Sequence, residues 1–406
     1  MSDAHGFLLG QRNYVLQVQK SLVSRPALGP DNGGDGEMDK AEYVLSCLED
    51  IGMDRILRLD APDSRVTAGK RPNLAAFIQG RDTGRTMWII SHLDVVPAGD
   101  VDTWESDPFT LRVDGDLIYG RGVEDNHQAV VSSLLCAKAV RSLGLRPEMN
   151  LGLLFVADEE TGNDYGLKYV LDKHGDIFGE NDLFLVPDFG RPDSGMLEIA
   201  EKSMLWMQVR VNGVQTHASR PDQGRNSLVA AADMITRTGS LEDIFSDTDA
   251  LFSPPRSTFN PTKMEANVPN INTIPGLDVF YIDCRILPRY DLRQVVAEIE
   301  GLASRVAEDH GVEIGCKPVH FEQAAPATDS RSNVVEKMRR AVRAVYSVEP
   351  EVQGVGGGTV ALYLRKQGYP AVVWSTLMNQ AHQANECSSV SNTINDARVF
   401  IETLTG

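Results

Sequence analysis

MWIISHLDVVPAG, residues 87–99, joins a short apolar run to the polar residues His92 and Asp94. A run of this length, rich in large and β-branched side chains, predicts a buried β-strand. Similar runs occur at residues 151–156, 183–186 and 371–374, separated by helical or loop stretches. This alternation predicts an α/β fold with a buried central sheet.

Acidic and imidazole side chains follow each of these predicted strands. Open α/β sheets bind ligands beyond the carboxyl ends of their strands, so side chains at these positions are expected to converge. A further aspartate, in the segment GRGVEDN (residues 120–126), precedes a predicted helix and can face the same crevice. The converging residues are His92, Asp94, Asp125, Glu159, Glu160, Asp188 and His382.

Each of these residues has a simpler explanation when it is taken alone. A single histidine after a strand is commonly a hydrogen-bonded surface residue, and a single aspartate before a helix is commonly its N-cap. The combination differs, because gathered carboxylates repel one another unless a cation neutralises them. Two imidazoles and three of these carboxylates, with no cysteine, suit a pair of hydrolytic zinc, cobalt or manganese ions.

The chain divides into two domains. Apolar residues at helical spacing predict helices over 36–52 and 128–143. Between 202 and 322 the predicted order is strand, helix, two strands, helix and strand, which is the ferredoxin-like pattern. These elements are expected at residues 205–211, 227–238, 263–267, 277–286, 292–310 and 312–318, with a surface loop at 246–262.

A helix over 333–346 and the strand at 371–374 resume the first pattern. We therefore expect a discontinuous catalytic domain of residues 1–200 and 323–406. An inserted ferredoxin-like α+β domain of residues 201–322 would interrupt it.

Composition excludes several classes of protein. The 406 residues are 42% hydrophobic and 24% charged, which is typical of a globular chain of two domains. No stretch approaches the roughly 18 consecutive apolar residues of a membrane span, and no secretory signal is recognisable, so the cytoplasm is expected. A net charge of −18 without a basic stripe argues against nucleic acid as a partner. The five scattered cysteines argue against disulfides and a thiolate zinc site.

The segments SHLDVVPAG, GRGVEDN, ADEETG, VPD and AHQANE resemble, in this order, the successive signatures of the M20 metallopeptidases. The resemblance covers nearly the whole chain and is close to the branch of acetylornithine deacetylase and succinyl-diaminopimelate desuccinylase. It implies a zinc-peptidase-like catalytic domain with a mixed central sheet flanked by helices. It also implies that the inserted domain serves as a lid and forms a homodimer.

By motif position, the resemblance implies two divalent metal ions about 3.5–4 Å apart. Zinc is the expected metal, with cobalt or manganese as alternatives. Asp125 would bridge the two ions, His92 and Asp188 would complete one site, and Glu160 and His382 would complete the other.

The same resemblance implies roles for the two remaining acids. Asp94 would orient the imidazole of His92 and raise its basicity. Glu159 would stay free of metal, take a proton from the attacking water and later pass it to the leaving amine.

Substrate contacts are implied at five further positions. His217 matches a family histidine that stabilises the oxyanion, often across a subunit boundary; an ordinary loop histidine is the alternative. Asn272 and Arg285 align with residues that hold a substrate carboxylate, although Arg285 is equally compatible with a surface position at a strand end. Gly357 and Thr359 match a Gly-rich turn near the substrate, whereas a phosphate loop would require a following lysine.

Three positions depart from the family pattern. Where many relatives read Asp-Met-Lys-Gly, this chain has Asp-Asn-His-Gln at 125–128, and His127 is interpreted as structural rather than as a ligand. Val360 stands where relatives often have aspartate, so specific substrate contacts there are in question. Position 188 carries an aspartate, as it does in several dipeptidases and aminopeptidases of the family. Several deacylases have a glutamate at this position.

The expected function is hydrolysis of an amide bond in a small N-acyl amino acid or a short peptide. A dipeptidase or aminopeptidase is the alternative to a deacylase within the same family. A non-catalytic homologue that keeps the fold is a further alternative, but the five ligand positions and Glu159 are all intact. A metal store would leave the separate Glu159 unexplained.

Overall fold

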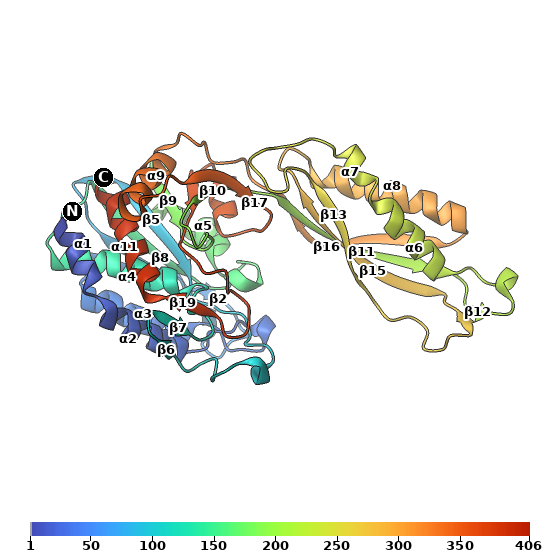
Figure 1. Cartoon of the computed structure of the whole chain (residues 1–406), viewed down its shortest axis with the longest axis horizontal. Helices are drawn as coiled ribbons and strands as arrows, with labels where there is room; N and C mark the ends of the chain where they lie inside the picture. The colour runs from blue at the N-terminus through green and yellow to red at the C-terminus, as the bar shows by residue number, and fades with distance from the viewer. Residues whose placement is uncertain (1) are drawn as a thin grey trace. The chain divides into compact units, whose positions relative to one another are not determined.

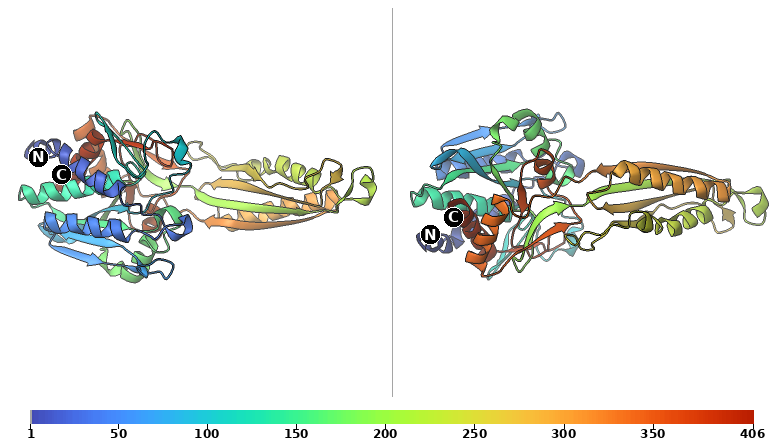
Figure 2. Two further views of the ribbon diagram at one scale, coloured as in Figure 1. Left: turned by 90° about the horizontal axis from the view of Figure 1, so that it is seen from below. Right: turned by 90° about the horizontal axis from the view of Figure 1, so that it is seen from above.

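The computed structural model describes residues 2–406, which form two compact units (Figures 1 and 2). The first unit comprises the residues up to 199 together with 327–353 and 359–406. The second unit comprises residues 200–326 and 354–358.

The second unit therefore includes residues 200, 323–326 and 354–358, which the sequence analysis assigns to the first domain. Hydrogen bonds account for the later segment. The N–H of Lys202 donates to the carbonyl of Val355 at 2.9 Å, and the N–H of Gly354 donates to the carbonyl of Leu251 at 2.7 Å. Contacts of this kind link residues far apart in sequence, so periodicity alone does not reveal them.

An eight-stranded mixed sheet forms the centre of the first unit. Its strands are β1 (Arg55–Arg58), β4 (Leu74–Ile78), β5 (Asp82–His92), β8 (Met149–Val156), β9 (Leu183–Val186), β10 (Met196–Glu201), β17 (Glu351–Val355) and β18 (Ala371–Val373). They lie in the order β1-β4-β8-β5-β9-β18-β10-β17. The inner strands β8, β5, β9 and β18 run parallel, whereas β4 is antiparallel to β8 and β10 to β18.

Helices cover both faces of this sheet. Those on the first face are α4 (His127–Ser142), α9 (Asn333–Tyr346) and α11 (Val390–Thr405), with α1 (Ser2–Leu9), α2 (Arg12–Val23) and α3 (Met38–Ile51) packed beside them (Figure 1). The opposite face packs against α5 (Leu167–His174) and α10 (Ala361–Lys366). Successive side chains of a strand point to opposite faces, and a sheet covered on both faces buries all of them. The uniformly apolar runs of β5, β8 and β9 follow from this burial.

Smaller elements complete the first unit. A three-stranded sheet, in the order β19-β7-β6, pairs the segment that precedes α4 with the segment that precedes α11. Its strands are β6 (Arg112–Asp114), β7 (Leu117–Tyr119) and β19 (Cys387–Ser389); β2 (Ala61–Pro62) and β3 (Lys70–Arg71) form a separate pair. The 3-10 helices are η1 (Pro30–Asn32), η2 (Val101–Thr103), η3 (Glu159–Thr161) and η4 (Gly175–Ile177).

The second unit is a four-stranded antiparallel sheet with two helices on one face. Its main elements are β11 (Ser203–Asn212), α6 (Ser227–Thr238), β13 (Thr258–Met264), β15 (Leu277–Ile286), α8 (Leu292–His310) and β16 (Glu313–Glu322). The strand order β13-β15-β11-β16 is that of a ferredoxin-like fold. Its core fills the space between the sheet and both helices. The shorter elements are β12 (Thr216–His217), η5 (Pro221–Gln223), α7 (Leu241–Ile244) and β14 (Thr273–Ile274).

The strand predicted at 263–267 was misplaced, because the structure has β13 at Thr258–Met264. Pro261 suggested a loop, since proline cannot donate to a sheet. β13 is, however, an edge strand, and its register with β15 is irregular between Pro261 and Lys263. Edge strands tolerate proline at such a position.

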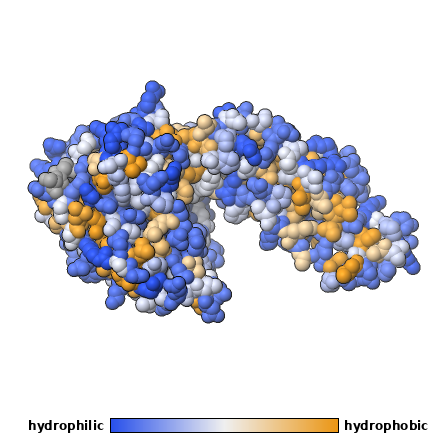
Figure 3. Space-filling view, viewed as in Figure 1, coloured by the Kyte–Doolittle hydropathy of each residue, from blue (hydrophilic) through white to orange (hydrophobic). Residues whose placement is uncertain are grey.

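The surface of the second unit carries several exposed apolar side chains. They include Leu228 and Val229 of α6, Ile244 of α7, and Val319 and Phe321 of β16. Apolar surface is visible on this unit in Figure 3. None of the helices within residues 2–406 has the length and apolar character needed to span a membrane.

Candidate active site

The inner parallel strands of the first unit place polar residues at one edge of the sheet. His92 is the last residue of β5, and Asp188 lies two residues beyond β9. Glu159 and Glu160 begin η3 just after β8, and His382 lies in the loop that follows β18. Because parallel strands share the direction in which they end, these residues meet at the carboxyl edge.

Five of the predicted residues form two overlapping groups. His92, Asp125 and Asp188 make up one group, and Asp125, Glu160 and His382 make up the other. Within each group the potential ligand atoms all lie within 4.8 Å of one another. Asp125 belongs to both groups, since its Oδ1 is 2.9 Å from His92 Nε2 and its Oδ2 is 3.1 Å from His382 Nε2.

The donor atoms in these groups suit divalent cations. The Nε2 atom of His92 also lies 3.3 Å from Asp188 Oδ1, and that of His382 lies 3.2 Å from Glu160 Oε2. The other oxygen of Glu160, Oε1, is buried without a hydrogen-bond partner. Imidazole nitrogen and carboxylate oxygen are ligands that zinc and similar ions accept.

Asp94 fixes two parts of this cluster. The backbone carbonyl of Asp94 accepts a hydrogen bond from Nδ1 of His92 at 3.0 Å, which leaves Nε2 of the neutral imidazole free to bind an ion. The Asp94 carboxylate accepts the backbone N–H of Glu159 at 3.0 Å and that of Glu160 at 2.9 Å. It thus holds η3 beside the end of β5.

The pKa shifts in the cluster follow from its burial and from its closely spaced imidazole and carboxyl groups. Burial lowers the pKa of His92, but hydrogen bonds with Asp125 and Asp188 outweigh this effect and raise it well above its usual value. Hydrogen bonds with Asp125 and Glu160 raise the pKa of His382 to about 10. Burial raises the pKa of Asp188, and it raises that of Glu160 to about 7. Without metal, protons balance these charges; divalent cations would replace the protons, so the residues fit a metal pair.

Glu159 belongs to neither group of potential ligands. Burial raises the pKa of its carboxyl group well above the ordinary value, and the nearby charge of Asp188 raises it further. The side chain is therefore a partly buried carboxyl group with a raised pKa, next to the potential ligands. A carboxyl group of this kind is suited to general acid–base chemistry.

Three residues that the sequence did not single out support the site. Asn126 accepts the N–H of His92 at 3.3 Å and donates to Asp188 Oδ1 at 2.7 Å, so it links two strand ends. Glu124 and Glu386 bind backbone amides of the loops that carry Asp125 and His382. The sequence shows that Asn126 stands where many relatives have methionine. No residue near it in the sequence indicates that its hydrogen-bond partners are His92 and Asp188.

His127, interpreted as structural, lies outside both groups of ligands. Its Nε2 atom is 2.7 Å from Nζ of Lys40, a buried residue of α3 whose pKa burial lowers to about 7. Gly122, with φ at +88°, packs against the same imidazole, and a Cβ at this position would lie 2.6 Å from its Cε1 atom. The histidine therefore fills the space beneath the loop that carries Asp125.

The predicted substrate contacts lie mainly in the second unit. His217 and Asn272 are neighbours there, because β12 pairs with β14 and the N–H of Ala218 donates to the carbonyl of Asn272 at 2.9 Å. The guanidinium of Arg285 donates to both carboxylate oxygens of Asp283, at 2.7 and 2.9 Å, and to the carbonyl of Gly356 at 2.9 Å.

The Gly-rich run is divided between the two units. Gly357 belongs to the second unit, and a Cβ at this position would meet no atom within 4 Å. Thr359 belongs to the first unit and is buried, and its Oγ1 accepts the N–H of Ala361 at the start of α10. Val360, where relatives often have aspartate, packs in the core beside α10.

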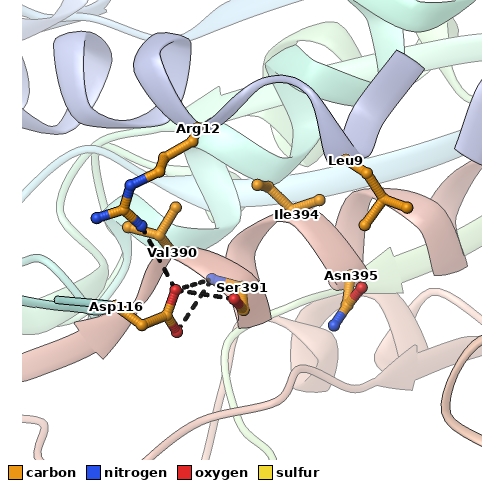
Figure 4. Close-up of a pocket in the computed structure, with 7 residues that line it drawn as sticks. All are labelled: Leu9, Arg12, Asp116, Val390, Ser391, Ile394 and Asn395. Carbon is orange, nitrogen blue, oxygen red and sulfur yellow. Dashed lines mark hydrogen bonds and ion pairs between the residues drawn. The ribbon is translucent and has the colours of Figure 1, made fainter. Parts of the chain in front are cut away.

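Two cavities are lined by other residues. One, of about 170 Å³, lies between α2 and the start of α11 (Figure 4). Within it Asp116 accepts hydrogen bonds from the hydroxyl of Ser391 at 2.8 Å and lies 3.6 Å from Arg12, so its charge is already compensated. The other, of about 360 Å³, lies in the second unit along residues 265–268 and the start of β15.

Comparison with known proteins identifies the family of this chain. Residues 88–406 match the model of peptidase family M20/M25/M40. The chain belongs to this family and is a metal-dependent hydrolase by class.

The chain is similar to particular proteins over nearly its full length. It is 37% identical to an uncharacterized metallohydrolase of Methanococcus maripaludis, over 96% of this chain and 98% of the relative. It is 23% identical to a succinyl-diaminopimelate desuccinylase of Polynucleobacter necessarius, with the same coverage. The dipeptidase Dug1p of Saccharomyces cerevisiae shares the fold, with a TM-score of 0.74 at 15% identity over 99% of this chain and 97% of that chain.

Proposed function

We propose that this protein hydrolyses an amide bond in a small N-acyl amino acid or a short peptide, using two divalent metal ions. The observation that carries the proposal is the sharing of one carboxylate, Asp125, by two groups of potential ligands. The partly buried Glu159 lies outside both groups, which leaves it available for proton transfer.

In this proposal His92, Asp188 and Asp125 hold one ion, and Glu160, His382 and the same Asp125 hold the other. Zinc is the proposed metal, with cobalt or manganese as alternatives. When bound, the ions would polarise the amide carbonyl. They would also lower the pKa of water, so that it can act as a nucleophile at neutral pH.

Glu159 then moves one proton in two steps. Its carboxylate takes a proton from the attacking water as the new C–O bond forms, and the resulting carboxylic acid gives that proton to the amide nitrogen as the C–N bond breaks. The products are an amine and a carboxylic acid, which retains the second proton of the water and releases it to solvent. Asp94 keeps Glu159 in place through the backbone hydrogen bond at 3.0 Å.

The second unit supplies most of the proposed substrate contacts, and Thr359 of the first unit supplies the remaining one. His217 would donate a hydrogen bond to the developing oxyanion, and Asn272, Arg285, Gly357 and Thr359 would bind the remainder of the substrate. For Arg285 this requires exchange of its present bonds to Asp283 for a substrate carboxylate. We also propose a homodimer through this unit, for which the exposed apolar side chains of α6 offer contact area.

Two kinds of substrate fit this chemistry. Acyl amino acids are favoured by similarity to a succinyl-diaminopimelate desuccinylase, whereas dipeptides are favoured by the aspartate at position 188 and by the fold of Dug1p. Both kinds of substrate contain an amide bond next to a carboxylate group.

The test is metal analysis coupled to a panel of acyl amino acids and dipeptides, assayed with wild type and Glu159→Gln. Turnover of either class by wild type, abolished in the variant at unchanged metal content, supports the proposal. Activity on acyl amino acids alone would exclude the dipeptidase alternative. A protein that binds metal but cleaves neither class would be a non-catalytic homologue for these substrates.

A further inference from the structure

Two loops of the first unit carry the residues that define the shared part of the site. The Asp125 loop, residues 120–126, lies between β7 and α4. The His382 loop, residues 374–386, lies between β18 and β19. Each loop contains a buried glutamate that is absent from both groups of potential ligands, Glu124 in the first and Glu386 in the second.

Glu386, in the His382 loop, binds the backbone of the Asp125 loop. Its Oε1 accepts the N–H of Glu124 at 3.0 Å and that of Asp125 at 3.1 Å. Its Oε2 accepts the N–H of Gly122 at 2.9 Å and a guanidinium N–H of Arg121 at 2.7 Å. All four donors belong to the Asp125 loop.

Glu124, in the Asp125 loop, binds the backbone of the His382 loop in return. Its Oε2 accepts the N–H of Met378 at 2.8 Å, and its Oε1 accepts the N–H of Gln380 at 2.8 Å. The two glutamates thus form a reciprocal pair, in which each loop donates its backbone amides to a carboxylate of the other. Six N–H groups of the two loops donate to these two carboxyl groups, so the pair joins the loops at several points.

The His382 loop needs such external support. Asn379, His382 and Asn385 have φ values of 61°, 65° and 58°, in the left-handed region that non-glycine residues seldom adopt. The surrounding structure supports this conformation, because the N–H groups that bind Glu124, those of Met378 and Gln380, flank Asn379 and precede His382. The position of the His382 imidazole depends on that conformation.

We propose that Glu124 and Glu386 are positioning residues that set the separation of Asp125 and His382, and so determine the affinity of the site for divalent metal. The inference rests on the proposed metal-dependent function. It assigns the two glutamates no contact with metal or substrate. Their effect is transmitted through the backbone of the two loops.

The experiment compares Glu124→Gln and Glu386→Gln with wild type and with Asp182→Asn as a matched control. Asp182 is also a buried carboxylate that accepts backbone and side-chain N–H groups, from Thr86 at 2.7 Å and Trp88 at 2.8 Å, but it lies at the opposite ends of β5 and β9. In each substitution an amide –NH₂ replaces an accepting oxygen, so hydrogen bonds are lost with little change in volume.

The first measurement is cobalt(II) binding to the chelator-treated protein, followed by visible absorption. We expect the two glutamine variants to bind cobalt(II) about 10- to 100-fold more weakly than wild type. Their cobalt absorption band should also change. Asp182→Asn should lower the melting temperature and leave cobalt affinity within about twofold of wild type. Unchanged affinity in both glutamine variants, or equal loss in the control, would overturn the proposal.

The second measurement is hydrogen exchange of the metal-free proteins, which does not depend on the proposed function. Either glutamine variant should exchange faster in both loops, residues 120–126 and 374–386, because the loops support each other. Faster exchange confined to the loop that loses its acceptor would overturn the reciprocal coupling. If wild type bound none of cobalt, zinc and manganese, the proposed function would fail, and exchange would still decide whether the pair couples the loops. If Glu386→Gln does not fold, Glu124→Gln, which loses fewer hydrogen bonds, gives the same readouts.

Discussion

The backbone N–H of Glu159 donates a hydrogen bond to Oδ1 of Asp94, with a distance of 3.0 Å between the two atoms. The same aspartate accepts Nδ1 of His92 through its backbone carbonyl. A single residue therefore connects a potential metal ligand on β5 with the proposed proton carrier on η3. We therefore expect the proposed catalytic geometry to depend on this connection.

Asp94→Asn should reduce kcat by about 10- to 100-fold while the melting temperature changes little. An asparagine keeps the carbonyl bond to His92 but replaces one carboxylate oxygen by an –NH₂ group, which cannot accept the N–H of Glu159 or Glu160. Steady-state kinetics with metal content measured on the same sample provides the test. Wild-type kcat in this variant would show that Asp94 does not position η3.

Glu159→Gln should lower kcat by at least about 10²- to 10⁴-fold, the usual contribution of a general acid–base. Metal content should stay near that of wild type, because Glu159 belongs to neither group of ligands. Glu160→Gln provides the matched control, since the adjacent residue should lose metal as well as activity. Full activity of Glu159→Gln would remove this residue from the mechanism.

The stability of the metal-free protein should depend on pH through Glu160. Burial raises the pKa of this carboxyl group from 4.5 to about 7. Its contribution to stability is therefore fully present below pH 4.5 and is lost as pH rises through about 7. Relative to Glu160→Gln, wild type should lose on the order of 3 kcal/mol of unfolding free energy between pH 4.5 and 8, since each pKa unit corresponds to about 1.4 kcal/mol.

Denaturant unfolding of both chelator-treated proteins across this pH range tests that expectation. A difference between the two proteins that stays constant with pH would contradict the raised pKa. Added metal should reverse the order of stability at pH 8, because the ionised carboxylate of Glu160 is then a ligand.

Much of the site followed from the sequence. The apolar runs at 87–90, 151–156 and 183–186 fall within the parallel strands β5, β8 and β9, and their shared direction brings the following polar residues together. The helices predicted over 227–238, 292–310 and 333–346 coincide with α6, α8 and α9. Such elements are predictable because periodicity is a local property of the chain.

Long-range contacts were not predictable in the same way. Glu386 and the N–H of Asp125 are separated by 261 residues, and no pattern near either one indicates the other. The edge position of Pro261 and the transfer of residues 354–358 to the second unit also depend on the tertiary structure. Arg285 followed the family pattern, but its engagement with Asp283 was not apparent from sequence.

His217→Ala should reduce kcat without changing metal content, whereas His382→Ala should lose metal. The difference follows from position, because His382 Nε2 lies 3.1 Å from Asp125 and His217 belongs to the other unit. Mixing His217→Ala with Glu159→Gln tests action across subunits. Partial recovery of activity in the mixture would support a shared site, and a fully active monomer by sedimentation would contradict it.

The most direct test of the account is titration of the chelator-treated protein with zinc, with amide hydrolysis assayed on the same samples. The account predicts two equivalents bound per chain in wild type, with activity appearing as they bind, and fewer than two in Asp125→Ala. A wild-type chain that binds no zinc, cobalt or manganese would contradict the central claim that Asp125 joins two metal sites.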